Sequence, residues 1–415
     1  MFNYLSFYHS KINMGNSDST LVNIDSDACQ FGQIIKNVQG LSSNSKSPSD
    51  TWVLFLKNNV FYEHIPIHKA FIKIWPSQIT QDIRDVVPEM LDVNERGLST
   101  AIDRLEYERE VYKRVIRPLM DLNVCTNFIR YLASGVDCSY SDLDSMLPRE
   151  YRPNLALNTL YMIQYHFTSA RYPRARPSIT DNVRGLEHEF GGKAPEVVND
   201  LEQTRYGFVV NTISPKSAPL VAILDKLSEQ ELLSILFQVF AAIHAMELTL
   251  TNQNDLHMGN IMITNGDLNS YLYVIEGNVY TIRTKHFARI YDFDNAFTSH
   301  LGPNQKYAKF KSSRDLVNVK YLLNQHPERH ALKTVFNLRG SPGESVEEIW
   351  GLMGHQQPRP MDYVVDFVEK YNPKIFVCSS TMFTPEGLLD ADRALLEREL
   401  FMDSIKQYGT FSHIQ

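Results

Sequence analysis

The chain has 415 residues, of which 43% are hydrophobic and 21% charged, so it can bury one large core or two smaller ones. Its net charge of -7 argues against a surface built mainly to neutralise nucleic-acid phosphates, and no nucleic-acid partner is expected. The sequence shows neither a signal peptide nor a run of about 18 apolar residues, so we expect a cytoplasmic protein without a transmembrane segment. The four cysteines are dispersed, which predicts neither a disulfide framework nor a zinc site.

Runs of β-branched and aromatic residues predict three strands of an antiparallel sheet near the N-terminus. They are FGQIIKNV (31–38), TWVLFLKN (51–58) and KAFIKIW (69–75). The Ser/Pro-rich stretch LSSNSKSPSD (41–50) separates the first two runs and predicts a solvated loop. Residues 1–20 precede the sheet as an N-terminal extension.

A long amphipathic helix is predicted from Ser99 to Leu119, because apolar residues recur there at helical spacing. Two further strands should follow, NFIRYLA (127–133) and YGFVVNTI (206–213). Between them, residues 140–203 predict an inserted helical segment. We therefore expect residues 21–213 to form one lobe, made of strands, one long helix and this insertion.

Residues 214–415 are predicted to form a mainly helical lobe. A helix should begin after Ser228, which can cap it in a capping box with Glu231. Short strands should follow in NIMIT (260–264), YLYVIEGNVYTI (271–282, with a turn at Glu276-Gly277-Asn278) and ARIYDFDNAF (288–297), and further helices from residue 314, notably DRALLERELFMDSIKQ (392–407). This order of elements predicts an α+β protein with two lobes.

Two polar motifs in the helical half carry the candidate chemistry. In NDLHMGN (254–260), Asp255 and Asn260 have D-x-x-x-x-N spacing, and in RIYDFDNA (289–296), Asp292 ends an apolar strand. An Asp can accept a hydroxyl proton, while an Asn and a second Asp can supply oxygen ligands to Mg²⁺ beside nucleotide phosphates. Taken singly, each motif also fits a structural role, as a polar turn or as a solvated Asp at the end of a strand.

Together these motifs resemble the protein-kinase-like superfamily. The resemblance implies a two-lobed fold, with a small antiparallel-sheet N-lobe and a mainly helical C-lobe. It also implies an enzyme that uses ATP and Mg²⁺ to phosphorylate a hydroxyl group, with Asp255 as catalytic residue and Asn260 and Asp292 as metal ligands. Catalysis in such an enzyme depends on positioning and electrostatics.

The strand KAFIKIW resembles the V-A-I-K strand of this superfamily, which implies that Lys73 contacts nucleotide phosphates. Lys69 is a weaker alternative, because it lies at the start of the strand. Glu108 fits best as the partner of Lys73, because the Glu of the family precedes an apolar or aromatic pair at this spacing. The structural alternative is an edge lysine and a solvated helix face. The helix offers three acidic candidates, Glu106, Glu108 and Glu110.

The nucleotide loop matches the family less well. In SDACQFGQII (26–35), Phe31 and Gly32 match the end of the glycine-rich pattern, whereas Asp27 and Cys29 stand at the places of earlier glycines. Backbone amides could then approach phosphate less closely, and Asp27 would repel it. An ordinary β-turn at Gly32 is the alternative.

Two further positions are assigned by the same resemblance. VVNTISP (209–215), including Val210 and Asn211, should form the hinge between the lobes, whose backbone reads adenine. Asp315, in SSRDLVNVKYLL (312–323), should support the backbone of the catalytic loop. Asp315 could equally be an acidic residue that the helix dipole favours at the start of a helix.

The sequence departs from protein kinases at several positions. Gln253-Asn254 stands where His-Arg usually precedes the catalytic Asp, so no Arg in this loop can bind a phosphorylated activation loop. His257 replaces the usual Lys, as in aminoglycoside and choline kinases, and could bind phosphate or structure the loop. Asp294 occupies the third D-F-G position, and residues 297–313 contain no A-P-E motif.

The D-L-H and D-F-D motifs without A-P-E also resemble divergent kinases of large cytoplasmic DNA viruses. We therefore predict a viral-type Ser/Thr protein kinase of the host cytoplasm or virion, whose partner is a protein with a Ser/Thr hydroxyl. One alternative is a small-molecule kinase of the aminoglycoside or choline type, acting on an alcohol. Another is a pseudokinase scaffold that binds partners without turnover.

Overall fold

The computed structural model describes residues 35–40, 50–56, 61–62, 65–78, 95–121, 124–139, 141–142, 205–214, 216–275, 278–304, 309–311, 314–323, 342–355 and 377–379. Several sequence-based predictions lie outside these residues. They concern Phe31 and Gly32, the loop 41–49, nearly all of the insertion 140–203 and the helix 392–407.

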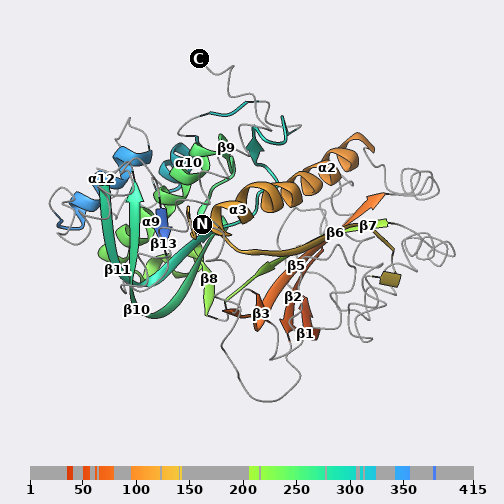
Figure 1. Cartoon of the computed structure of the whole chain (residues 1–415), viewed down its shortest axis with the longest axis horizontal. Helices are drawn as coiled ribbons and strands as arrows, with labels where there is room; N and C mark the ends of the chain where they lie inside the picture. Colours follow the sequence, from red (N-terminus) through yellow and green to blue (C-terminus); the bar gives the residue numbers. More distant parts are fainter. Residues whose placement is uncertain are drawn as a thin grey trace, which may run out of the picture.

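A five-stranded antiparallel sheet forms one half of the molecule (Figure 1). Its strand order is β1-β2-β5-β7-β6, and the three strands predicted near the N-terminus are confirmed as neighbours in it. Lys73 lies in the middle strand, β5, directly opposite Val209 of β7. The strands are β1 (Ile35–Gly40), β2 (Asp50–Leu56), β5 (Lys69–Gln78), β6 (Tyr131–Ser139) and β7 (Arg205–Thr212), and a separate pair joins β3 (Phe61–Tyr62) to β4 (Ile65–Pro66).

Helix α2 (Glu95–Val111) packs against β5 and β7 of this sheet. The sequence predicted one helix from Ser99 to Leu119, but α2 begins earlier and runs into a π-helical turn, η2 (Tyr112–Ile116), before α3 (Arg117–Asp121). A π turn adds one residue to a helical turn and is frequent at functional sites. Here it turns the buried Tyr112 toward the candidate site described below.

The strand predicted at 127–133 begins later, at Tyr131. The preceding residues instead join the other half of the molecule, because Ile129 N donates to Ile290 O at 3.1 Å and Ile290 N donates to Asn127 O at 2.9 Å. Apolar residues are buried both in a strand that starts at 127 and in the observed pairing with Ile290, so the sequence pattern did not distinguish the two.

Cys138 of β6 is disulfide-bonded, which the dispersed cysteines did not predict, because distance along the chain does not limit proximity in space.

Helix α9 (Glu229–Leu248) is the central helix of the second half. Its predicted capping box is confirmed, with Ser228 accepting from the Glu231 backbone and Glu231 accepting from the Ser228 backbone. Among the described helices it is the one long and apolar enough to cross a membrane, yet 83% of its most apolar window is buried inside the protein. It packs against β11 and α12 as a core helix.

The separate short strands predicted after α9 are instead one long hairpin. β10 (Ile261–Ile275) pairs with β11 (Asn278–Ile290), and the register shifts between Asn265 and Asn269. The polar residues around this irregularity break the apolar pattern, which is why the sequence predicted shorter strands. Two short strands pair with β10, β8 (Ser217–Pro219) and β13 (Val377–Ser379), the second in a region predicted to be helical.

Figure 1 shows the sheet with α2 and α3 on one side and the hairpin with α9, α10 and α12 on the other. This is the predicted α+β arrangement with two lobes. Two helices predicted after residue 314 are present, α10 (Arg314–Leu323) and α12 (Pro342–Leu352). The short elements are α8 (Leu220–Ile223), η5 (Leu224–Lys226), β9 (Thr251–Asn252), η6 (Met258–Asn260) and β12 (Phe297–Thr298).

Candidate active site

Lys73 makes two ion pairs in the space between the sheet and the second half. Its Nζ lies 2.6 Å from Glu108 Oε2 of α2 and 3.0 Å from Asp292 Oδ1. Because alternate strand residues face the same side, Lys73 and Phe71 point toward α2 while Ile72 packs on the opposite face of the sheet. Strand, helix and the segment after β11 therefore meet at one ammonium group.

Neighbouring contacts explain why Glu108 alone of the three acidic candidates reaches Lys73. Glu106 accepts from Trp75 Nε1 at 2.9 Å. Glu110 pairs with Arg109 of α2 and with Arg114 of η2. Lys69, the alternative to Lys73, lies 5.4 Å from the centre of the Phe55 ring. The predicted roles of Lys73 and Glu108 stay predictions, while their contact is part of the structure.

Burial and charge shift the pKa values of this pair. Burial alone would lower the pKa of Lys73, but the carboxylates of Asp292 and Glu108 outweigh it and raise the pKa above its ordinary value. Burial raises the pKa of Glu108 to about 7, against the opposing effect of Lys73. Lys73 is therefore a cation at all ordinary pH values, whereas Glu108 can take up a proton near neutrality.

The backbone at Asp292 adopts a left-handed conformation, with φ of 65°, that costs energy for a residue other than glycine. Three contacts hold it. Gln253 Nε2 donates to Asp292 O at 2.6 Å, and Asp292 N donates to the Tyr112 hydroxyl at 3.1 Å. Phe293 N donates to Glu108 Oε1 at 3.3 Å, while its ring is buried against Tyr112. Strain supported in this way is typical of functional sites.

Helix α10 holds the loop that carries Asp255 through hydrogen bonds to the loop backbone. Asp315 accepts from Gln253 N at 2.8 Å and from Asn254 N at 2.7 Å. Burial raises the pKa of Asp315 to about 6, against the lowering effect of these two hydrogen bonds. Asn254 also has a positive φ of 65°, so this loop is a second strained segment. The anchoring leaves Asp255 itself exposed to solvent.

Asn260 and His257 order the rest of this loop. Asn260 Nδ2 donates to Asp255 O at 3.0 Å, and Asn260 O accepts from Tyr291 N at 3.1 Å, which puts Asn260 beside the residue that precedes Asp292. His257 Nδ1 accepts from Gly259 N at 2.9 Å. His257 was predicted either to bind phosphate or to structure the loop, and this contact is of the second kind.

Two residues that the sequence did not single out complete the site. Asn295 Nδ2 donates to Asp255 Oδ2 at 3.2 Å and to Asp294 Oδ1 at 2.8 Å. Arg104 of α2 donates to Asp294 Oδ2 at 2.8 Å and to Asn295 Oδ1 at 2.7 Å. Burial first, and then Asp292, raise the pKa of Asp294. Arg104 lies four residues before Glu108, and residues at this spacing share a helix face. This spacing was the signal in the sequence that could have placed Arg104 near the site.

The donor set suits a hard cation such as Mg²⁺. Asp292 supplies carboxylate oxygens, and the side-chain Oδ1 of Asn260 accepts no hydrogen bond from the described residues. Within the described part of the chain, no group of three or more His, Cys, Asp or Glu side chains could hold a metal ion by itself. Proteins usually hold Mg²⁺ with one or two side-chain oxygens and complete its coordination with nucleotide phosphates and water. The two side chains here fit that arrangement and are too few for a site built from protein ligands alone.

The predicted hinge residues lie within the sheet. Val210 pairs with Ile72 of β5, and the N–H groups of Thr212 and Ile213 donate to backbone carbonyls of the same lobe. These backbone groups are thus engaged within the lobe, and the predicted reading of adenine by this segment stays a prediction. Among the described residues, no hydrogen-bond partner contacts Nδ2 or Oδ1 of the Asn211 side chain, which is fully buried.

Asn211 lies on the face of the sheet that carries Lys73. It is directly opposite Phe71, and directly opposed residues of an antiparallel pair share a face. A buried amide without a partner costs free energy and offers one donor and one acceptor to a ligand. The edge of a nucleotide base has groups that are complementary to such an amide.

Comparisons with known proteins yield only distant likenesses. No protein-family model matches the chain, and no curated protein matches it. Among solved structures, the chain is similar to the pseudokinase PEAK1 (Sugen Kinase 269; 11% identity, TM-score 0.33, covering 94% of this chain and 85% of that one). It is also similar to WaaP, solved in complex with acyl carrier protein (9%, 0.29, 82% and 90%), and to the kinase domain of PF14_0431 (10%, 0.33, 91% and 91%). Similarities this low assign no role to any residue.

Proposed function

We propose that the chain is an ATP- and Mg²⁺-dependent phosphotransferase that acts on a hydroxyl acceptor, and specifically a divergent viral-type Ser/Thr protein kinase. One observation carries the proposal, namely that Lys73 contacts Glu108 and Asp292 while Asn260 and Asp255 lie on the adjoining loop. A cation for phosphate, oxygen ligands for a metal and an exposed carboxylate are the groups that phosphoryl transfer needs.

Each residue has a part in the proposed reaction. Asp255 orients the acceptor hydroxyl and takes its proton, and Asn295 fixes the Asp255 carboxylate through the 3.2 Å hydrogen bond. Lys73, held by Glu108, neutralises phosphate charge. Asp292 and Asn260 would hold magnesium, which when bound would neutralise the charge on the β- and γ-phosphates. Asn211 would receive the base.

The acceptor is proposed to be a protein. His257 and Asp294 were the features that favoured a small-molecule kinase, and both make internal contacts. His257 accepts from the Gly259 backbone, and Asp294 is bound by Arg104. These contacts account for both residues without a small-molecule substrate, which supports the protein acceptor.

A pseudokinase scaffold is the second candidate, and the Lys73–Asp292 ion pair favours it. The ammonium group of Lys73 lies 3.0 Å from the Asp292 carboxylate, the group that would otherwise hold the metal. If this pair persists when nucleotide binds, the chain binds ATP without a metal and does not transfer phosphate.

Transfer of γ-labelled phosphate separates these functions. We expect wild-type protein with Mg·ATP to label Ser or Thr of a casein-like protein panel, and Asp255→Asn to lose at least about a hundredfold in rate. Asp267→Asn, an exposed residue of β10, is the matched control and should keep the wild-type rate. Labelling of amino alcohols or aminoglycosides instead would establish the small-molecule kinase. Thermal stabilisation by nucleotide without transfer to any acceptor would establish the scaffold.

A further inference from the structure

A cavity of about 200 Å³ lies on the β10–β11 hairpin, beside the register shift between Asn265 and Asn269. One water needs roughly 10–15 Å³ of such space, so this half-open cavity has room for a group the size of phosphate. Its lining residues are Thr264, Gly266, Asn269, Tyr271, Lys285, Phe287 and Arg289. None of these residues belongs to the candidate active site.

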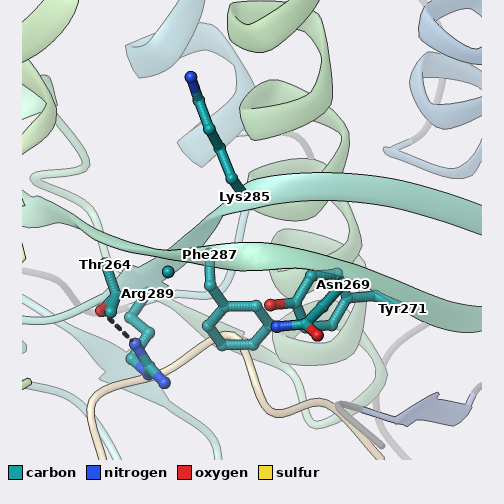
Figure 2. Close-up of a pocket in the computed structure, with 7 residues that line it drawn as sticks. Thr264, Asn269, Tyr271, Lys285, Phe287 and Arg289 are labelled. Carbon is teal, nitrogen blue, oxygen red and sulfur yellow. Dashed lines mark hydrogen bonds between the residues drawn. The ribbon is translucent and has the colours of Figure 1, made fainter. Parts of the chain in front are cut away.

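Arg289 supplies the charge of the cavity. Its guanidinium lies over the Phe287 ring, 4.5 Å from the ring centre, and donates to Thr264 Oγ1 at 2.6 Å (Figure 2). A guanidinium group has five N–H donors, and this hydrogen bond uses one of them. The remaining donors of Arg289 make no hydrogen bond or ion pair with the described residues.

No carboxylate in the described part of the chain compensates this charge. Figure 2 shows Lys285 on the opposite side of the ribbon from Phe287, and Lys285 is paired with Glu231 Oε1 at 2.8 Å. Burial lowers the pKa of Arg289 to about 10, and the positive charge of Arg130 lowers it as well. Arg289 is half-buried and stays charged near pH 7, and a second cation lies nearby.

The polar groups around Arg289 suit an anion. The Asn269 amide and the Tyr271 hydroxyl lie together beneath the hairpin, near the Phe287 ring (Figure 2). A half-buried cation without a counter-ion has lost part of its hydration, and an anion that pairs with it can form charge-assisted hydrogen bonds. A tetrahedral phosphate has enough oxygens to accept from the guanidinium and from the neutral donors at once.

We propose that this cavity is a binding site for the phosphoryl group of a small molecule, with Arg289 as its principal ligand and Thr264, Asn269 and Tyr271 as supporting groups. The site does not depend on the proposed phosphotransferase activity. It lies on β11, the strand that leads into Tyr291 and Asp292, but its occupancy can be measured without catalysis.

Inorganic phosphate is the probe, measured as the rise in melting temperature at constant ionic strength, with chloride as the reference salt. A ligand that binds only the folded state stabilises it according to its dissociation constant. We expect phosphate to stabilise wild type and Lys73→Met, in which a phosphate site beside Lys73 is removed. Arg289→Gln should weaken the binding by at least about tenfold. Arg283→Gln, an exposed arginine of the same strand, should bind as wild type does.

Three outcomes would overturn the proposal. They are no stabilisation of wild type beyond chloride, equal stabilisation of Arg289→Gln, and loss of the effect in Lys73→Met with retention in Arg289→Gln. Circular dichroism checks that Arg289→Gln is folded. If it is not, Thr264→Val decides, because it keeps the side-chain volume and removes the hydroxyl that orients Arg289. Weaker phosphate binding by this variant supports the site, and unchanged binding contradicts it. A sugar monophosphate tested beside inorganic phosphate identifies which source of the phosphoryl group binds more tightly.

Discussion

Lys73 and Asp292 are 219 residues apart in the sequence, and their side chains lie 3.0 Å apart. The same ammonium group contacts Glu108 at 2.6 Å, so one lysine joins β5, α2 and the segment after β11. The Lys73–Glu108 contact is buried, where an unpaired charge is costly, whereas the Asp292 side chain is partly exposed. The positions of the three elements are therefore linked through one cation.

Replacing Lys73 tests this link. Lys73→Met leaves the buried Glu108 carboxylate unpaired, which should lower the free energy of unfolding by about 3–5 kcal/mol in a denaturant titration. It should also reduce phosphate transfer at least about a hundredfold. Lys69→Met, on the same strand, is the matched control and should leave both quantities near wild type. The double variant Lys73→Met/Glu108→Leu should be more stable than Lys73→Met alone, and equal or lower stability contradicts the ion-pair account.

The pH dependence of activity should follow Glu108. Burial raises its pKa to about 7, so above pH 7 the carboxylate form predominates and holds Lys73, while below pH 7 protonation removes the charge that holds it. We expect kcat/KM for ATP to fall on the acid side with an apparent pKa near 7. In Glu108→Gln this acid limb should be absent at a lower overall rate. An acid limb of the same position in Glu108→Gln would assign the titration to another group.

Asn295 should position the catalytic carboxylate. Asn295→Ala removes its hydrogen bond to Asp255, and a hydrogen bond to a charged group contributes about 1.5–3 kcal/mol, or roughly tenfold to a hundredfold in rate. We expect kcat to fall by this factor with little change in KM for ATP, because Asn295 makes no contact with Lys73. Asn295→Asp keeps the size but loses the donor, and should be impaired at least as strongly. Wild-type kcat in either variant would remove Asn295 from the mechanism.

Asp315 should stabilise the catalytic loop. Asp315→Ala leaves the buried N–H groups of Gln253 and Asn254 without their acceptor, at about 1–3 kcal/mol each. The melting temperature should fall clearly. Asp267→Ala, an exposed residue of β10, should change stability by less than about 0.5 kcal/mol. If both variants melt alike, the two hydrogen bonds do not stabilise the loop.

The local patterns of the sequence predicted much of the fold. Alternating apolar residues gave β2 and β5, and Ser228 with Glu231 marked the start of α9, because these signals depend on neighbours in the chain. Strands on both sides of the turn at Glu276-Gly277-Asn278 were predicted, but not that each continues as one long strand of the β10–β11 hairpin, since its polar centre interrupts the pattern that periodicity detects. The late start of β6 was missed for another reason. The residues before it pair with Ile290, a contact between distant parts of the chain.

The same distinction holds at the candidate site. Resemblance identified Lys73, Glu108 and Asp292 by type and spacing, and the structure brings them together. It did not identify Asn295 or Arg104, because neither stands at a position that the resembling motifs specify. Their importance comes from three-dimensional contacts with Asp255 and Asp294.

The central claim is that Asp292 and Asn260 hold one divalent cation beside a nucleotide. Electron paramagnetic resonance of Mn²⁺, titrated with protein and a non-hydrolysable ATP analogue, measures this directly. Wild type should bind Mn²⁺ more tightly in the presence of the analogue, and Asp292→Asn combined with Asn260→Ala should weaken that binding by at least about tenfold. Asp267→Asn should match wild type. Nucleotide-dependent Mn²⁺ binding that is unchanged in the Asp292→Asn/Asn260→Ala protein would contradict the account.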